Sequence, residues 1–329
     1  MQRFCRYTVM KYWFSLCLLS LTISAAFSQS NYLHYHQGIN QTEALIVEEQ
    51  FSEAVRAYDS LFAEYEYVFL KDLLIAAQIA VLSEQPEKTT QWLERALKKG
   101  YQCDCITRMP VFEKYIETKA WQHLLDQSEE FKADYYSSIQ LQWHREFHQR
   151  YKREQESKTA SDRSAYISIV SNNYQRIKVL MDSVPFPSER IVGIDNEMLF
   201  PSQNGGKLSN CDAANSKVIP TLLHYDNPIT DIGWDKFVAA LQSGHLHPNQ
   251  FATIYSFESN YVSRLNANKN INRPELPQYY FQFPFGKKSK DLEKVNRHRA
   301  QFGICSIELS EKKKLICRKY RLRMRFGYQ

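Results

Sequence analysis

The sequence predicts a mainly α-helical protein, and three observations support this prediction. Only 10 Gly and 11 Pro occur in 329 residues, so few positions are expected to interrupt a helix. In most segments, apolar residues recur at helical spacing. Residues 42–62 also align with residues 77–97 at an offset of 35 residues. We therefore expect helix hairpins followed by a helical C-terminal domain with one or two short strands.

The length of the chain is sufficient for two domains, and its composition is that of a globular protein with 43% hydrophobic and 24% charged residues. The predicted organisation has four parts. They are a signal peptide (1–28), a helical repeat domain (29–130), a long polar helix and linker (131–163), and a helical domain of unknown function with a basic C-terminal segment (164–329).

The first 28 residues have the pattern of a secretory signal peptide. Basic residues precede the apolar run WFSLCLLSLTISAAF, and Ala26-Phe27-Ser28 gives a small-x-small cleavage pattern before Gln29. The apolar run is too short and too poorly flanked for a membrane span, although retention as an N-terminal anchor stays open. The sequence thus predicts an exported protein, either periplasmic or secreted.

Each copy of the repeat has the layout of a helix hairpin. An apolar helix ends in the polar segment EEQ or SEQ, and a second helix follows with apolar residues on one face. Pro86 suits the first turn of a helix, and Lys98-Lys99-Gly100 suits its end. Breaks are expected near Gln50, Tyr67 and Gln85. Small residues fall where the paired helices must approach closely: Ala44, Ala54, Ala76, Ala77, Ala80 and Ala96.

This period and layout resemble the tetratricopeptide repeat (TPR) family, although the full Trp-Gly-Tyr signature is missing. Two units cover roughly residues 33–100, and residues 112–131 supply helices that cap them, since a helix pair needs stacked neighbours to bury its apolar face. The resemblance implies a concave face that binds a protein or peptide partner. A purely structural platform and a plain helical bundle stay open as alternatives.

The middle of the chain, residues 131–163, is polar and lacks Pro and Gly, which predicts a long exposed helix. Within it, His144 and His148 stand at i and i+4 on one face. The order HREFH does not place glutamate where a zinc-protease helix requires it, so we expect two solvated histidines. Within residues 172–193, an amphipathic helix is expected to end at Val184-Pro185, with Ser188 as a candidate cap.

Two or three further helices are predicted over residues 218–227 and 233–259. Gly244 is expected to end one helix and Pro248 to begin the next, with His245 and His247 in the loop between them. A metal site there needs a third ligand, and His224 is the only nearby candidate. We therefore expect a solvated connector, and no metal or other cofactor.

The C-terminal region combines extended and helical patterns. Residues 276–286 alternate aromatics and predict a short extended segment, whereas residues 288–303 predict a helix closing at Gly303. Residues 319–326 alternate basic and apolar side chains, which predicts a strand with one basic face. A frayed cationic tail is the alternative.

Positive charge is concentrated in this region. Residues 287–329 contain 14 Lys/Arg against 4 Asp/Glu, and residues 29–286 carry a net charge of −7. Such a segment meets nucleic acid, an anionic membrane, a polyanionic glycan or an acidic face of the same protein. Because the body is acidic and export is predicted, we favour an internal contact or an anionic membrane or glycan surface, with no nucleic-acid partner.

Five cysteines remain after the predicted cleavage: Cys103, Cys105, Cys211, Cys305 and Cys317. The odd number leaves at least one unpaired. The C-x-C segment is too tight for an easy disulfide and lacks the second pair of a zinc knuckle. A Cys305–Cys317 disulfide across a turn stays open, since an oxidising compartment permits it.

A second resemblance covers roughly residues 110–310. The order of short motifs is similar to that of an uncharacterised family of exported Bacteroidota-type proteins, in which TPR-like helices precede a domain of unknown function. Leu223 replaces the usual Gln before the His, and Glu154-Gln155 replaces an Asp-Gln. No chemical activity is established for this family, so the resemblance implies none for this chain. The matching positions are Phe186-Pro187, His224, Gly244-Leu246-Pro248, Tyr280 with Gln282, and Asn296-Arg299-Gly303.

No strong catalytic signature is present, because the P-loop, G-x-G-x-x-G, G-x-S-x-G, HExxH and paired Cys-x-x-Cys motifs are all missing. We therefore predict a protein- or ligand-binding module of the cell envelope rather than an enzyme. A site in the C-terminal domain is expected to use His224, Tyr280, Gln282 and Arg299 to bind the ligand. Arg299 is expected to hold a carboxylate, either a ligand's or that of Glu258.

The alternative function is an envelope enzyme, such as a hydrolase, with a site centred on His224. Histidine is the side chain best suited to act as a base near neutral pH. A carboxylate, from Glu258 or Asp226, would orient it, and the phenol of Tyr280 would complete the site.

Overall fold

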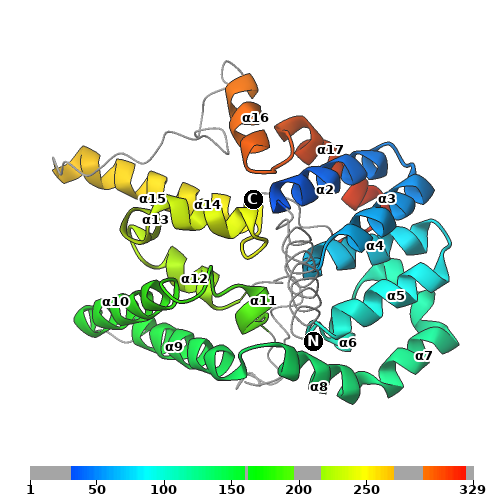
Figure 1. Cartoon of the computed structure of the whole chain (residues 1–329), viewed down its shortest axis with the longest axis horizontal. Helices are drawn as coiled ribbons and strands as arrows, with labels where there is room; N and C mark the ends of the chain where they lie inside the picture. Colours follow the sequence, from blue (N-terminus) through cyan, green and yellow to red (C-terminus); the bar gives the residue numbers. More distant parts are fainter. Residues whose placement is uncertain (1–30, 160–161, 196–215, 270–291, 324–329) are drawn as a thin grey trace, which may run out of the picture. The chain divides into compact units, whose positions relative to one another are not determined.

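Helices account for most of the residues that the structure describes, and no strand occurs among them (Figure 1). The computed structural model describes residues 31–159, 162–195, 216–269 and 292–323. The chain divides into two units, Met1–Asn31 and Tyr32–Gln329, and the second is described here by itself. The predicted mainly helical fold is confirmed. The predicted signal peptide, Cys211, Tyr280 and Gln282 lie outside the described residues.

The repeat region forms two helix hairpins. The first consists of α2 (Tyr32–Val47) and α3 (Phe51–Glu64), and the second of α4 (Leu70–Leu82) and α5 (Pro86–Leu97). The helices pack in sequence, α2 on α3, α3 on α4 and α4 on α5. The helix breaks therefore fall where the sequence predicts them.

The two hairpins turn in the same way at the same place in the repeat. Glu49 and Glu84, 35 residues apart, both have a positive φ, of 60° and 57°. The next residue in each turn donates its backbone N–H back into the first helix, Gln50 to Leu45 O and Gln85 to Ala80 O, both at 2.9 Å. Such bonds satisfy carbonyl groups at the helix end. The two copies of the repeat therefore share the same backbone conformation in their turns.

A first hydrophobic core joins the repeat region to the C-terminal helix. It contains residues of α2 to α5 and of the three helices after them, and also Ile316 and Leu322 from the end of the described chain. Helix α17 (Ile307–Tyr320) packs on α2 and lies beside it in Figure 1. The helices after α5 are α6 (Cys103–Thr107), α7 (Lys119–Asp126) and α8 (Ser128–Ser138), with short 3₁₀ turns at Pro110–Phe112 and Tyr115–Glu117.

A second hydrophobic core is built from the helices between α8 and α17. Phe186, Phe237 and Phe251 lie fully buried within it. Gly244 ends α14, Pro248 begins α15 and Ser188 caps α11, as predicted. The helices are α9 (Leu141–Thr159), α10 (Arg163–Leu180), α11 (Glu189–Val192), α12 (Val218–Leu223), α13 (Pro228–Ile232), α14 (Trp234–Gln242), α15 (Pro248–Lys269) and α16 (Leu292–Gln301).

The polar segment expected as one long exposed helix is interrupted. Helix α8 ends at Ser138, and Gln140 donates its N–H to Ile191 O at 2.7 Å before α9 begins. His144 and His148 are also not solvated, since only 2% and 7% of their surfaces are exposed. The predictions of one continuous helix and of solvated histidines were wrong. Helix α9 packs the face that carries His144 and His148 against the segment around α11.

The predicted strand over residues 319–326 is also wrong where the structure describes it. Ser306 caps α17 by accepting from Leu309 N at 3.1 Å, and the helix continues to Tyr320. Residues 324–326 lie outside the described chain. The alternating pattern spans too few residues to exclude a helix, and packing against α2 decides between the two structures.

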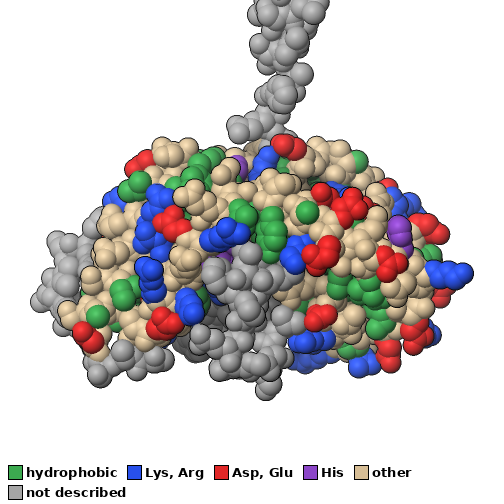
Figure 2. Space-filling view, turned by 90° about the horizontal axis from the view of Figure 1, so that it is seen from below, with side chains coloured by type: hydrophobic (Ala, Val, Ile, Leu, Met, Phe, Trp, Pro, Cys, Tyr) green, Lys and Arg blue, Asp and Glu red, His purple; other side chains and the backbone are tan. Residues whose placement is uncertain are grey.

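The basic C-terminal segment makes the internal acidic contact that was one of its predicted alternatives. Lys313 contacts Glu43, and Lys319 contacts Glu49 at 2.6 Å, both on the first hairpin. On the face seen in Figure 2, basic and acidic side chains are intermingled. Part of the C-terminal charge is therefore neutralised within the molecule.

The cysteines answer the open question about pairing. Cys103, Cys305 and Cys317 do not form disulfides, so the candidate Cys305–Cys317 disulfide is not formed. Cys105 is disulfide-bonded. No helix in the described ranges has the length and apolar character needed to cross a membrane.

Candidate functional site

His224 follows α12 and contacts a carboxylate, although not the predicted one. Its Nδ1 atom contacts Glu154 on α9. The Glu154 side chain is fully buried and also accepts a hydrogen bond from Asn173 Nδ2 at 2.8 Å. The His224 ring stacks on Tyr151 at 6.1 Å. Buried Glu154 thus orients a partly exposed imidazole.

Other polar residues of α9 hold the loop around α11 and α12. His144 Nδ1 lies 2.6 Å from Val192 O, and His148 Nε2 lies 3.0 Å from Asp195 Oδ1. Lys217 contacts the second oxygen of Asp195. Burial, together with the nearby His148, lowers the pKa of His144 to about 4. These contacts fix the loop, and they use the side chains that the sequence analysis treated as solvated.

Glu258 does not orient His224. One of its oxygens accepts from Ile229 N at 2.6 Å, and the other accepts from the backbone and hydroxyl of Thr230 at 3.1 and 2.6 Å. A carboxylate at a helix N-terminus satisfies backbone N–H groups that have no partner within the helix. Glu258 therefore anchors α13 to α15, and the proposed pairs with His224 and with Arg299 are not formed.

Arg299 is buried and binds the backbone of the turn that leads into α17. Its Nε donates to Cys305 O at 2.5 Å, and the residue is 1% exposed. Asn296 accepts from Ile307 N at 2.9 Å and donates to Glu308 at 2.8 Å. Asn296 and Arg299 therefore both bind the segment that leads into α17, and in the described chain they position this helix.

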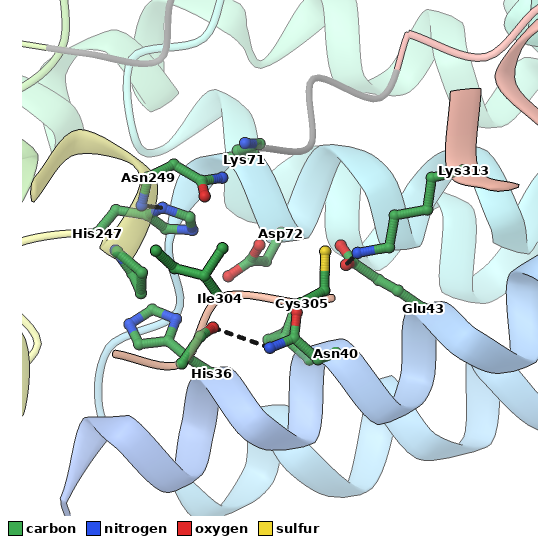
Figure 3. Close-up of a pocket in the computed structure, with 13 residues that line it drawn as sticks. His36, Asn40, Glu43, Lys71, Asp72, His247, Asn249, Ile304, Cys305 and Lys313 are labelled. Atoms are coloured by element: carbon green, nitrogen blue, oxygen red, sulfur yellow. Dashed lines mark hydrogen bonds and ion pairs between the residues drawn. The ribbon is translucent and has the colours of Figure 1, made fainter. Parts of the chain in front are cut away.

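A cavity that the sequence analysis missed lies between α2, α4, the start of α15 and the approach to α17 (Figure 3). Its volume is about 30 Å³, which has room for about two water molecules. In Figure 3, His36 and His247 stand at one end, with Glu43 and Lys313 at the other. The other lining residues are Ile39, Asn40, Lys71, Asp72, Pro248, Asn249, Gly303, Ile304 and Cys305.

Ionisable groups around this cavity pair across distant parts of the chain. Lys313 on α17 contacts Glu43 on α2, with 2% and 3% of the side chains exposed. Tyr35 on α2 donates to Asp72 on α4 at 2.7 Å. Buried charges are tolerated when they are paired or hydrogen-bonded in this way. The cluster ties the C-terminal helix to the first hairpin.

Burial shifts the acid–base behaviour of these groups. It lowers the pKa of His36 to about 3 and holds the pKa of His247 well below its ordinary value, in both cases with help from Lys71. Burial raises the pKa of Asp72 to about 7. Both imidazoles are consequently neutral at pH 7. The cavity is too small to admit a substrate beside them, so we interpret the cluster as structural.

His247 and His245 are loop residues, as predicted, but they are not a solvated connector. The His247 ring lies 5.1 Å from that of His36 and 5.2 Å from that of Phe69. Burial lowers the pKa of His245 to about 4. A side chain at Gly244, which has φ of 73°, would place its Cβ 2.6 Å from the Tyr32 ring. The loop is therefore packed on α2.

Comparison with known proteins gives no match. No protein-family model, curated protein or solved structure is similar to this chain. Within the described ranges, no three or more His, Cys, Asp or Glu side chains are grouped to hold a metal ion. The resemblances to TPR proteins and to an exported family therefore stay predictions.

A sequence signal for the missed residues existed. Glu43 directly precedes the apolar run ALIV, and Asp72 belongs to the apolar helix LKDLLIAAQIAVL. An acidic residue on an apolar helix face requires a buried partner. The sequence does not show which partner, because Lys313 is 270 residues from Glu43.

Proposed function

We propose that this chain is an exported binding protein of the cell envelope, built on TPR-like hairpins, and that its α2/α4 face recognises a basic helical peptide. The observation that carries the proposal is the position of α17. This basic helix packs on α2, and the residues just after it reach α4. In the resting chain, the peptide on that face is the protein's own C-terminal segment.

The hairpin geometry supports the TPR-like part of the proposal. The turns at Glu49 and Glu84 share one conformation at a spacing of 35 residues. Helices α2 and α4 are the first helices of their hairpins, and the resemblance to TPR-like stacks implies a concave face that binds a peptide. Helices α7 and α8 pack against α5 and provide the cap that a short stack needs.

The contacts of α17 are those of a recognised peptide. Glu43 and Glu49 receive Lys313 and Lys319. Gln78 on α4 binds the backbone of Arg323 twice, accepting from its N–H at 2.8 Å and donating to its carbonyl at 3.3 Å. The acidic side chains thus favour a basic peptide, and the Gln78 amide binds the peptide backbone independently of its side chains. A partner with the same chemistry would compete for this face.

The outer side of α17 supports the predicted contact with an anionic membrane or glycan. Lys312, Lys314 and Arg318 are exposed there, and Leu315 is 62% exposed. Basic side chains flanking an exposed apolar residue suit an anionic surface. This contact leaves the α2/α4 face unaffected.

The test supplies the C-terminal helix as a separate peptide. In full-length Lys313→Ala, the docking of the chain's own helix is weakened and Glu43 lacks its partner. A labelled synthetic peptide of residues 306–323 should bind this variant more tightly than the wild-type protein and raise its Tm. The matched control is the same peptide with Ala at position 313. Equal binding of the two peptides, or no binding, would contradict the proposal.

The enzyme alternative is favoured by one observation, the contact between His224 and buried Glu154. A carboxylate that orients a histidine is part of many general-base sites. Glu154 takes the role that the sequence analysis gave to Glu258. Turnover of chromogenic ester or amide substrates by the wild-type protein, lost in both His224→Gln and Glu154→Gln, would favour this alternative.

A further inference from the structure

A second and larger cavity lies away from α17, where α4 begins and α5 ends. Its volume is about 290 Å³, close to the lower limit of small-molecule sites. The walls come from the loop before α4, the turn after α5, the end of α8, and α11. The lining residues are Glu66, Tyr67, Leu70, Lys99, Tyr135, Ser138, Ile139, Glu189, Arg190 and Ile194.

The rigid wall of this cavity is the Tyr135 ring. Its hydroxyl accepts from Ile194 N at 3.0 Å. Gly100 and Gly193, both at positive φ, press against the ring, and an added Cβ would lie 2.6 Å and 2.1 Å from its atoms. Only glycine fits a left-handed position with so little space. The position of the Tyr135 ring, and with it this wall of the cavity, is therefore fixed by the fold.

The acidic groups of the lining already have partners. Glu189 is buried, and its Oε1 accepts from Tyr67 OH at 2.9 Å and from Leu70 N at 3.0 Å. Glu66 pairs with Arg190 at 2.9 Å. One carboxylate is thus held by hydrogen bonds and the other by an ion pair.

The Lys99 ammonium is the lining group that lacks an acceptor. Its Nζ lies 3.6 Å from the centre of the Tyr67 ring, and the structure shows no hydrogen bond or ion pair for it within the described residues. Burial lowers the pKa of Lys99 to about 8, although Glu189 opposes the shift. An ammonium group has three donors and gains from an anionic acceptor in a partly buried site.

The geometry points to a binding site for a small monocarboxylate with an apolar body. The ligand's carboxylate would accept hydrogen bonds from Lys99, and its carbon chain would lie against Leu70, Ile139 and Ile194. A dianion is disfavoured, since Arg190 is already paired with Glu66 and Lys99 can balance one negative charge. This site goes beyond the proposed function, because it is separate from the α2/α4 face.

Binding to the full-length protein tests the site. The probe is hexanoate, measured by calorimetry beside hexanol, its uncharged counterpart, and inorganic phosphate. We expect hexanoate to bind, and Lys99→Met to weaken that binding about tenfold or more. Lys98→Met is the matched control, since the neighbouring Lys98 pairs with Glu94 at 2.8 Å on the surface. Neither substitution should change the binding of the synthetic peptide of residues 306–323.

A second measurement requires no substitution. Trace acetylation of the wild-type protein, read by mass spectrometry, reports the reactivity of each lysine. Hexanoate should slow the modification of Lys99 and leave that of Lys98 unchanged. Equal binding by wild type and Lys99→Met, equal binding of hexanol, preference for phosphate, or no protection of Lys99 would each overturn the inference.

Discussion

Glu43 on α2 and Lys313 on α17 form a buried ion pair although 270 residues separate them in the sequence. Burial opposes charge on both groups, yet the Glu43 carboxylate raises the pKa of Lys313 above its ordinary value. The pair joins the last described helix to the first. It makes the C-terminal segment part of the first hydrophobic core.

Loss of one partner of this pair should destabilise the protein strongly. Lys313→Ala leaves the Glu43 carboxylate buried without its cation, so we expect the free energy of unfolding to fall by about 3–5 kcal/mol. The double variant Glu43→Gln/Lys313→Met should recover much of this loss. Chemical denaturation of the three proteins measures both effects. Lys319→Ala, at the exposed pair with Glu49, is the control and should change little.

His36 should make stability depend on pH. Its pKa in the folded protein is about 3, below that of an unfolded-state histidine at about 6.5. The unfolded state therefore binds the proton between these values, and stability is lost as the pH falls from about 6.5 toward 3. His36→Phe should reduce the slope of unfolding free energy against pH by up to about 1.4 kcal/mol per pH unit.

Phe is the suitable replacement because His36 Nε2 is buried and has no hydrogen-bond partner among the described residues, and its ring contacts Phe69. The control is His34→Phe, at an exposed position of the same helix. Urea unfolding at several pH values gives the slopes. A His36→Phe slope equal to that of the wild-type protein would contradict a buried, neutral His36.

Arg299→Ala should lower stability without affecting ligand binding. The substitution leaves Cys305 O without the guanidinium donor, which costs about 1–3 kcal/mol for a buried group. It also removes the packing of a side chain that is 1% exposed. A lower Tm is therefore expected. An unchanged Tm would instead return Arg299 to the group of ligand-binding candidates.

Export is a separate prediction from the first 28 residues. N-terminal sequencing of protein from fractionated cells should find a mature chain that begins near Gln29. Recovery of the intact Met1 form from the cytoplasm would contradict it, and an intact form in the membrane fraction would indicate a retained anchor.

The candidate site was predicted in part. The sequence placed His224 in a polar site and gave it a carboxylate partner, but that partner is Glu154, not Glu258. The choice depends on the approach of α9 to the end of α12, 70 residues later in the chain. Arg299 was expected to hold a carboxylate, but it donates to the backbone carbonyl of Cys305.

The sequence by itself determined the helix hairpins and several helix ends. Helical periodicity, the Pro86 start, the Gly244 and Gly303 ends and the 35-residue repeat all depend on interactions within a few residues, which a linear pattern contains. Tertiary structure decided which polar groups are buried and which distant groups meet. Lys313 pairs with Glu43, and His36 and His144 are excluded from solvent, because whole helix faces pack together. The packing of distant faces leaves no pattern in the sequence around either residue alone.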